Sequence, residues 1–181
     1  PVLTPMAMDS SRPFPLIRNK TLNIGALIAK KDRKKEEKIL EFATVQVPSV
    51  LPRVVLIPGG KNDKQSVIFL EELIERNIGK LFLNNDVVCA HPYRIMRNAD
   101  LSIDEDEAED LLVEIQKQLK KRQWGEVIRL EVEEKMDSRL LKILKSELEI
   151  KEEDIFTIPG PLDLTVLMKL YGLDGFEDYR A

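Results

Sequence analysis

Residues 128–148, IRLEVEEKMDSRLLKILKSEL, join a strand pattern to a helix pattern. In residues 128–133 apolar and charged side chains alternate, which predicts a strand with one buried face. The other face carries Arg129, Glu131 and Glu133, and we expect these side chains to be exposed or paired. A strand followed closely by a helix predicts a fold that uses both kinds of element.

The helix is predicted to begin at about Asp137, a residue type that favours helix starts. Met136, just before it, and Leu141, in the first turn, are spaced to form a hydrophobic staple. The inner face is expected to consist of Leu140, Leu144 and Leu148.

Several other stretches are short and apolar, and proline, glycine or charged residues bound them, which favours strands. They are residues 22–28, 42–47, 53–57, 67–69 and 154–158. Residues 87–96 are also strand-like, but Pro92 cannot donate a ladder hydrogen bond, so we expect an edge position or a bulge there. Charged or glycine-rich residues at 30–38 and 59–64 predict hairpin-like connections rather than domain boundaries.

Three further helices complete the predicted elements. Residues 70–82 have a helical apolar face made by Leu70, Leu73, Ile74, Ile78 and Leu81. Another helix is expected from Asp104, with Glu107 completing a capping-box-like arrangement, to about Trp124. A short one is expected at residues 164–171. The combination predicts an α+β fold, with a mixed, largely antiparallel sheet and helices packed on it in two layers, as a single domain over residues 1–181.

Composition is that of a globular chain, with 43% hydrophobic and 33% charged residues of both signs. No run of about 18 apolar residues that could span a membrane occurs. Cys89 is the only cysteine, which excludes an internal disulfide and favours a reducing, cytoplasmic setting. The formal charge of −4 gives no overall attraction for nucleic acid or membranes. Since the chain starts at Pro1, we expect it to be a piece of a longer protein.

Few residues present the chemistry of an active site. The acidic residues between Asp100 and Asp110 have the ligand type that Mg²⁺ prefers, but a helix dipole favours such residues in a first turn without any metal. His91 and Cys89 share a strand, whereas a Cys–His nucleophile pair normally comes from different elements. Residues 59–61, GGK, lack the spacing of a phosphate-binding loop. The sequence therefore predicts no catalytic residue and no metal site.

Two arginines form a more suggestive pattern. Arg94 and Arg97 bracket an apolar pair near the end of a predicted strand, and guanidinium groups on a rigid strand are good forks for phosphate oxygens. The competing interpretation is an ion pair with Asp100 or Asp104.

Residues 93–101, YRIMRNADL, followed by residues 104–112, DEDEAEDLL, closely resemble the middle of polyphosphate kinases. Further stretches agree in the same order: PVLTP at 1–5 with PFP at 13–15, VP at 47–48 with LPR at 51–53, and GPLDLT at 160–165 with LM at 167–168. The resemblance spans nearly the whole chain. The family usually has His where Arg12 stands and commonly Thr where Met96 stands, so neither position is expected to perform chemistry here.

The resemblance implies a larger enzyme that reversibly transfers the terminal phosphate of ATP to inorganic polyphosphate through a phosphohistidine, with Mg²⁺. The catalytic histidines belong to two carboxy-terminal domains, and an amino-terminal helical domain contributes to adenine binding; none of these is in this chain. The part present is similar to the head domain, which provides homodimer contacts and walls the tunnel for ATP and polyphosphate. His91 matches no catalytic position of the family, so the chain alone is expected to be inactive and to bind no cofactor tightly.

Candidates for the tunnel wall are Arg94, Arg97, Arg53 and Arg18. The alternative is a free-standing phosphate- or nucleotide-binding module that uses Arg94 and Arg97, with Arg53 or Arg18. A third class is a small hydrolase that works through the acidic residues 100–110.

Overall fold

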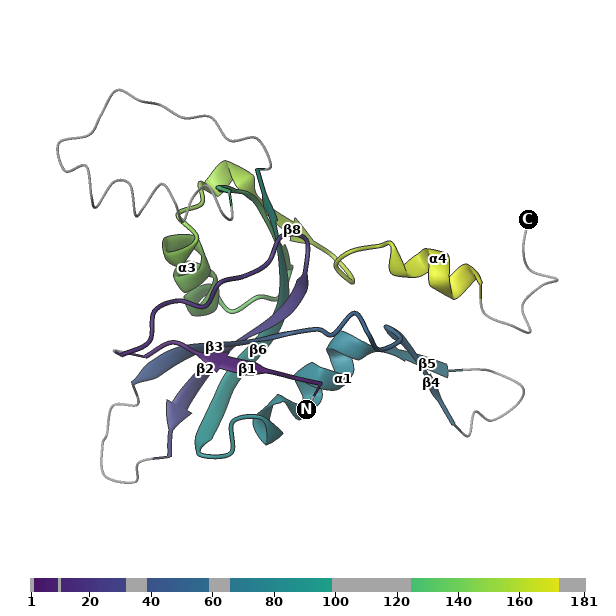
Figure 1. The fold of residues 1–181 in the computed structure, drawn as a ribbon, viewed down its shortest axis with the longest axis horizontal. Helices are drawn as coiled ribbons and strands as arrows, with labels where there is room; N and C mark the ends of the chain where they lie inside the picture. Colours follow the sequence, from purple (N-terminus) through teal and green to yellow (C-terminus); the bar gives the residue numbers. More distant parts are fainter. Residues whose placement is uncertain (1, 10, 32–38, 59–65, 99–124, 173–181) are drawn as a thin grey trace.

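A six-stranded sheet organises the computed structural model, which describes residues 2–9, 11–31, 39–58, 66–98 and 125–172 (Figure 1). Its strands are β1 (Pro5–Ala7), β2 (Leu22–Lys30), β3 (Leu40–Gln46), β6 (Asn85–Arg97), β7 (Val127–Glu133) and β8 (Ile155–Ile158). They lie in the order β1-β3-β2-β6-β7-β8. Neighbours pair antiparallel except β7 and β8, which pair parallel. The predicted mixed, largely antiparallel sheet of an α+β fold is confirmed.

A separate hairpin and the helices complete the described elements. The hairpin joins β4 (Val54–Ile57) to β5 (Ser66–Phe69). The helices are α1 (Leu70–Asn77), α3 (Ser138–Glu147) and α4 (Val166–Tyr171), with short 3₁₀ turns η1 (Ile78–Lys80) and η2 (Glu152–Asp154). Antiparallel pairing of β2 with β3 and of β4 with β5 confirms both predicted hairpins. The helix expected from Asp104 lies outside the described residues.

The sheet is covered on both faces, which differs from the two-layer arrangement expected from sequence. One buried cluster joins the sheet to α3 and includes Phe42, Tyr93, Ile95, Leu130, Leu140 and Leu144. The other joins the opposite face to α1 and includes Ile24, Ala26, Val45, Leu70, Ile74 and Ile78. Figure 1 shows α3 and α1 on different sides of the strands. Because β2 contributes to both clusters, eight of its nine residues are buried.

Pro92 lies in a central strand, so the predicted edge position is wrong for β6 as a whole. A proline still needs a position where its missing N–H is not required by a neighbouring strand. Pro92 has such a position, because β6 pairs with β7 only from Tyr93 onward. At Pro92 the strand pairs with β2, and no ladder hydrogen bond is lost on the other side. The irregularity in the β2–β6 pairing lies nearby, between Cys89 and Val87.

A bulge changes the pattern of β7 from the strict alternation expected. The register shifts between Met96 and Arg97 of β6, so Ile128 has no direct partner. Ile128 is 46% exposed, although it was expected on the buried face, while Leu130 and Val132 are buried as predicted. Glu131 is also buried, at 8% exposure. The bulge therefore turns one apolar side chain out of the core.

Helix α3 follows its prediction closely. Asp137 is its N-cap, and the carboxylate accepts a hydrogen bond from the Arg139 backbone N–H at 2.9 Å. Leu140, Leu144 and Leu148 are buried. The helix predicted at 70–82 is shorter, because α1 ends at Asn77 and continues as η1. None of the helices in the described ranges is long and apolar enough to cross a membrane.

Candidate functional site

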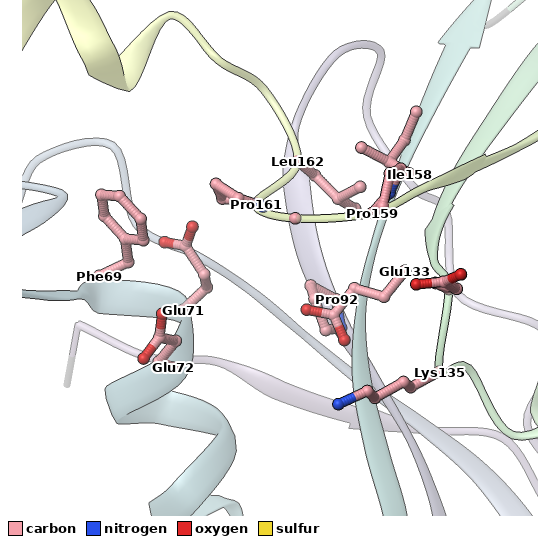
Figure 2. A pocket seen from close by; sticks show the side chains of 12 residues that line it. Phe69, Glu71, Glu72, Pro92, Glu133, Lys135, Ile158, Pro159, Pro161 and Leu162 are labelled. Carbon is pink, nitrogen blue, oxygen red and sulfur yellow. The ribbon is translucent and has the colours of Figure 1, made fainter.

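A cavity of 490 Å³ lies between α1 and the ends of β7 and β8. Figure 2 shows Glu71 and Glu72 on the α1 side, facing Glu133, Lys135 and Pro92 on the sheet side. The loop after β8, with Pro159, Pro161 and Leu162, runs above these side chains in Figure 2. Glu134 also lines the cavity, so carboxylates outnumber the lysine. Such a lining favours a cation over a phosphate-containing anion.

An ion pair between Arg53 and Glu71 forms one side of this region. The Arg53 Nε and Nη2 atoms donate to the Glu71 carboxylate at 2.6 to 3.0 Å. The same guanidinium donates to the backbone carbonyls of Leu162 and, at 2.7 Å, of Asp163. The two side chains are only 13% and 6% exposed. Arg53 thus joins three segments that are distant in the sequence: the start of β4, α1 and the loop after β8.

A smaller hollow of 230 Å³ lies on another side of Arg53. Its lining includes Lys20, Arg53 and Lys169, together with Ser49, Thr165 and Asp163. Cations outnumber carboxylates here, the reverse of the larger cavity. Within the described part of the chain, this is the place where Arg53 combines with other basic side chains.

Hydrogen bonds to β7 and to the segment before β2 hold the Arg94 side chain on β6. Its Nη1 donates to Glu131 Oε2 at 3.2 Å, and its Nε donates to the Lys20 carbonyl at 3.3 Å. Glu131 also accepts from Arg129 at 2.8 Å, and the Arg129 guanidinium lies 3.8 Å from the centre of the Phe156 ring. Arg94 therefore belongs to a partly buried network that spans β6, β7 and β8.

Arg97 is held by backbone groups on both sides of the strand end. Its Nε donates to the Ile17 carbonyl at 3.1 Å and its Nη1 to the Gly125 carbonyl at 2.9 Å. Burial lowers the pKa of this guanidinium. Gly125 has φ of +67°, and a Cβ there would lie 2.0 Å from the Asn98 carbonyl oxygen. The close approach that Arg97 stabilises thus requires glycine.

Arg18 is exposed and lies in the same segment, residues 17–20, that Arg94 and Arg97 contact. Its carbonyl accepts a hydrogen bond from the Thr21 hydroxyl at 2.9 Å. The fold therefore brings Arg18, Arg94 and Arg97 to one segment and places Arg53 against α1. The partners considered from sequence for Arg94 and Arg97, Asp100 and Asp104, lie outside the described residues, as do the acidic residues of the hydrolase hypothesis. That any of the four arginines lines a phosphate tunnel stays a prediction.

A second group of side chains was not identified from sequence. Glu75 of α1, His91 of β6 and Glu133 of β7 place one ligand-type atom each within 4.8 Å of one another. Burial, followed by the nearby charge of Glu133, raises the pKa of Glu75. Neither strand alternation nor helix periodicity predicts that these three side chains lie close together, because each residue comes from a different element.

Cys89 does not share this cluster. Its side chain packs against the α3-side core, and burial raises the pKa of the thiol. A raised pKa disfavours the thiolate that a nucleophile needs. These features argue against Cys89 as the nucleophile of a Cys89–His91 pair.

Residues 1–170 match the family model described as the polyphosphate kinase middle domain. The chain belongs to this family. It is 50% identical over 172 residues to the polyphosphate kinase of Halalkalibacterium halodurans, covering 94% of this chain and 24% of that protein. It is also 50% identical over 179 residues to that of Lactiplantibacillus plantarum, covering 98% of this chain and 24% of that protein. The middle-domain chain thus spans about a quarter of the length of these relatives.

A solved structure has the same fold. The polyphosphate kinase of Porphyromonas gingivalis matches with a TM-score of 0.71 at 21% identity, over 97% of this chain and 23% of that one. At this identity the match supports the fold of the middle domain alone. The resemblance found in residues 93–112 and the stretches around them is confirmed at the level of the family.

Proposed function

We propose that residues 1–181 form a single, non-catalytic domain of a cytoplasmic polyphosphate kinase. The complete enzyme transfers the terminal phosphate of ATP reversibly to inorganic polyphosphate through a phosphohistidine, with Mg²⁺. This domain provides homodimer contacts and part of the wall of the ATP and polyphosphate tunnel, while the catalytic histidines lie in other domains. Family membership and the quarter-length coverage of the kinase relatives support this proposal.

The observation that carries the proposal is the internal use of the arginines. Arg53, Arg94 and Arg97 donate to carboxylates or carbonyls of this chain, so their charge and fork geometry already hold segments together. A guanidinium that already makes these hydrogen bonds is better suited to a structural role in the tunnel wall than to binding a phosphate. Binding a phosphate would leave the buried carboxylates and carbonyls without their donors. Arg18, which is exposed, is the candidate of the four that we assign to direct contact with the tunnel contents.

Exposed apolar side chains support contact with neighbouring domains. On the C-terminal segment with α4, Leu164, Leu167 and Met168 are 57%, 47% and 75% exposed. Leu56 and Ile57 of β4 are about half exposed, and α4 contacts β4. Apolar side chains exposed on neighbouring elements favour an interaction site here.

Activity of the isolated chain tests the proposal. With ATP and Mg²⁺, we expect no polyphosphate synthesis by the 181-residue chain, because we assign no catalytic role to His91, its single histidine. Synthesis that disappears in His91→Ala would contradict the scaffold. Titration with polyphosphate separates the alternative module: salt-sensitive binding abolished by Arg97→Ala, but kept by the control Arg139→Ala, would support that module instead.

A further inference from the structure

We propose that Glu75, His91 and Glu133 bind one Zn²⁺ ion. Their candidate ligand atoms converge from α1, β6 and β7, and the proposed kinase scaffold gives this group no role. The inference is therefore independent of the tunnel and of phosphate transfer. It also differs from the expectation from sequence that the chain has no metal site, which rested on the acidic residues 100–110.

The geometry needs little adjustment to bind the ion. Zinc bonds of about 2.1 Å place the ligand atoms of a tetrahedral site roughly 3.4 Å apart. The His91 Nδ1 and Glu133 Oε2 atoms are already 3.7 Å apart, and all three ligand atoms lie within 4.8 Å of one another. Side-chain rotations on fixed strands and a fixed helix close the remaining gap. The supporting elements are rigid, because α1 and β6 both pack in the same buried region of the fold.

Charge at the cluster favours a dication. Two carboxylates, those of Glu75 and Glu133, approach each other here. A Zn²⁺ ion would neutralise both carboxylates while keeping the imidazole neutral.

The donor set distinguishes zinc from magnesium. One imidazole nitrogen with two carboxylates suits Zn²⁺, which accepts nitrogen and oxygen ligands in four-coordinate sites. Mg²⁺ prefers oxygen ligands in octahedral geometry and retains several waters. A set of three protein ligands leaves one position of a tetrahedral zinc site for water.

The neighbouring cavity supplies a route for the ion. Glu133 belongs to the cluster and also lines the 490 Å³ cavity, where Figure 2 shows its carboxylate near Pro92 and Lys135. Side-chain exposures of 18% for His91 and 31% for Glu133 place the ligands beneath the surface but within reach of solvent. An ion that enters here reaches His91 and Glu75 without opening the core.

Isothermal titration of ZnCl₂ into the chelator-treated 181-residue chain tests the proposal. We expect one Zn²⁺ per chain, with Mg²⁺ binding far more weakly. Glu75→Gln, His91→Gln and Glu133→Gln should each weaken zinc binding at least about 10-fold, since even loss of an outer-shell partner costs 10- to 100-fold. The controls Glu72→Gln and Glu134→Gln remove the same charge from the same cavity and should leave affinity within about twofold.

Thermal unfolding gives a second readout that does not depend on heats of binding. Zinc should raise the Tm of the wild-type chain and of both controls, and at the same zinc concentration should raise the Tm of the three ligand variants by less. Circular dichroism of the metal-free variants verifies that they fold. Absence of zinc binding by the folded wild type, equal binding by the ligand variants, or Mg²⁺ binding as tight as Zn²⁺ would overturn the proposal.

Discussion

Helices α1 and α3 cover opposite faces of one sheet, yet they are held at their N-termini in different ways. Helix α3 is capped locally by Asp137, whose side chain accepts from the Arg139 backbone. Helix α1 has Phe69 at its N-cap position and no side-chain cap. Its first N–H, that of Leu70, instead donates to the Arg53 carbonyl at 2.7 Å. One helix start is specified by neighbours in sequence, and the other by Arg53, a residue 17 positions earlier in the chain.

Arg53 also holds the start of α1 through its side chain. Arg53 binds Glu71 in the first turn of α1 and also the carbonyls of the loop after β8. The first turn of α1 therefore depends on a buried ion pair, whereas that of α3 depends on an exposed cap. Loss of the Arg53–Glu71 ion pair should consequently lower the free energy of unfolding much more than loss of the Asp137 cap.

Removing the Arg53 guanidinium should have the largest effect. Arg53→Met leaves Glu71 buried without its cation and should lower the free energy of unfolding by about 3–5 kcal/mol. Urea denaturation followed by circular dichroism measures the change. The double variant Arg53→Met with Glu71→Leu removes both charges and should recover most of the loss. A loss below about 1 kcal/mol in the single variant would show that α1 is held mainly by its apolar face.

Substitutions at two glycines test how tightly the two faces of the sheet are packed. A Cβ on Gly25 would lie 3.2 Å from Tyr93 Cε1 and 3.6 Å from Leu140. Tyr93 is fully buried and its hydroxyl is 2.9 Å from that of Thr44, so it cannot readily move away. Gly25→Ala should therefore cost about 1–3 kcal/mol of unfolding free energy.

Gly79 is the matched control, at the end of the α1 side. A Cβ there would meet nothing within 4 Å, so Gly79→Ala should be neutral or stabilise by about 0.4–1 kcal/mol through the unfolded chain. Thermal and urea unfolding of both variants make the comparison. Equal effects of the two substitutions would contradict the tighter packing of the α3 face at Gly25.

The same contrast explains what could be predicted from the sequence. Asp137 and the leucines of α3 were identifiable because cap and apolar face lie within one short stretch. The hairpins of β2 with β3 and β4 with β5 were identifiable from the connections between them. The exposure of Ile128 was not, because the bulge at the end of β6 depends on pairing with a distant strand. Coverage of both faces was missed for a related reason: strand patterns do not say on which face a helix packs.

For the candidate sites too, features carried by stretches of sequence were predictable, and features that form only in the folded chain were not. Family membership was predictable from ordered stretches along the chain and is confirmed. The partners of Arg53 were not predictable, because Glu71 and the loop at Leu162 and Asp163 approach it only in the folded chain. The cluster of Glu75, His91 and Glu133 was missed because it combines a helix with two strands.

The cap of α3 offers the smallest and most local test. Asp137→Ala should lower the free energy of unfolding by about 0.5–2 kcal/mol at neutral pH, less than the change expected at Arg53. Asp137→Asn keeps a capping side chain but removes the charge that pairs with Arg139 at 2.7 Å. Its loss should be smaller, about 0.2–1 kcal/mol, as for an exposed ion pair.

The pH dependence of this difference separates charge from capping. Hydrogen bonds from the Arg139 side chain and backbone hold the pKa of Asp137 well below its ordinary value of 3.8. Since the pKa is lowered by folding, the stabilisation is present above the unfolded value and is lost as pH falls through the folded value. The gap between wild type and Asp137→Asn, measured by urea unfolding from pH 7 to about pH 3, should therefore narrow at the acid end. A gap that stays constant with pH would mean that α3 is held by the shape of its cap and not by its charge.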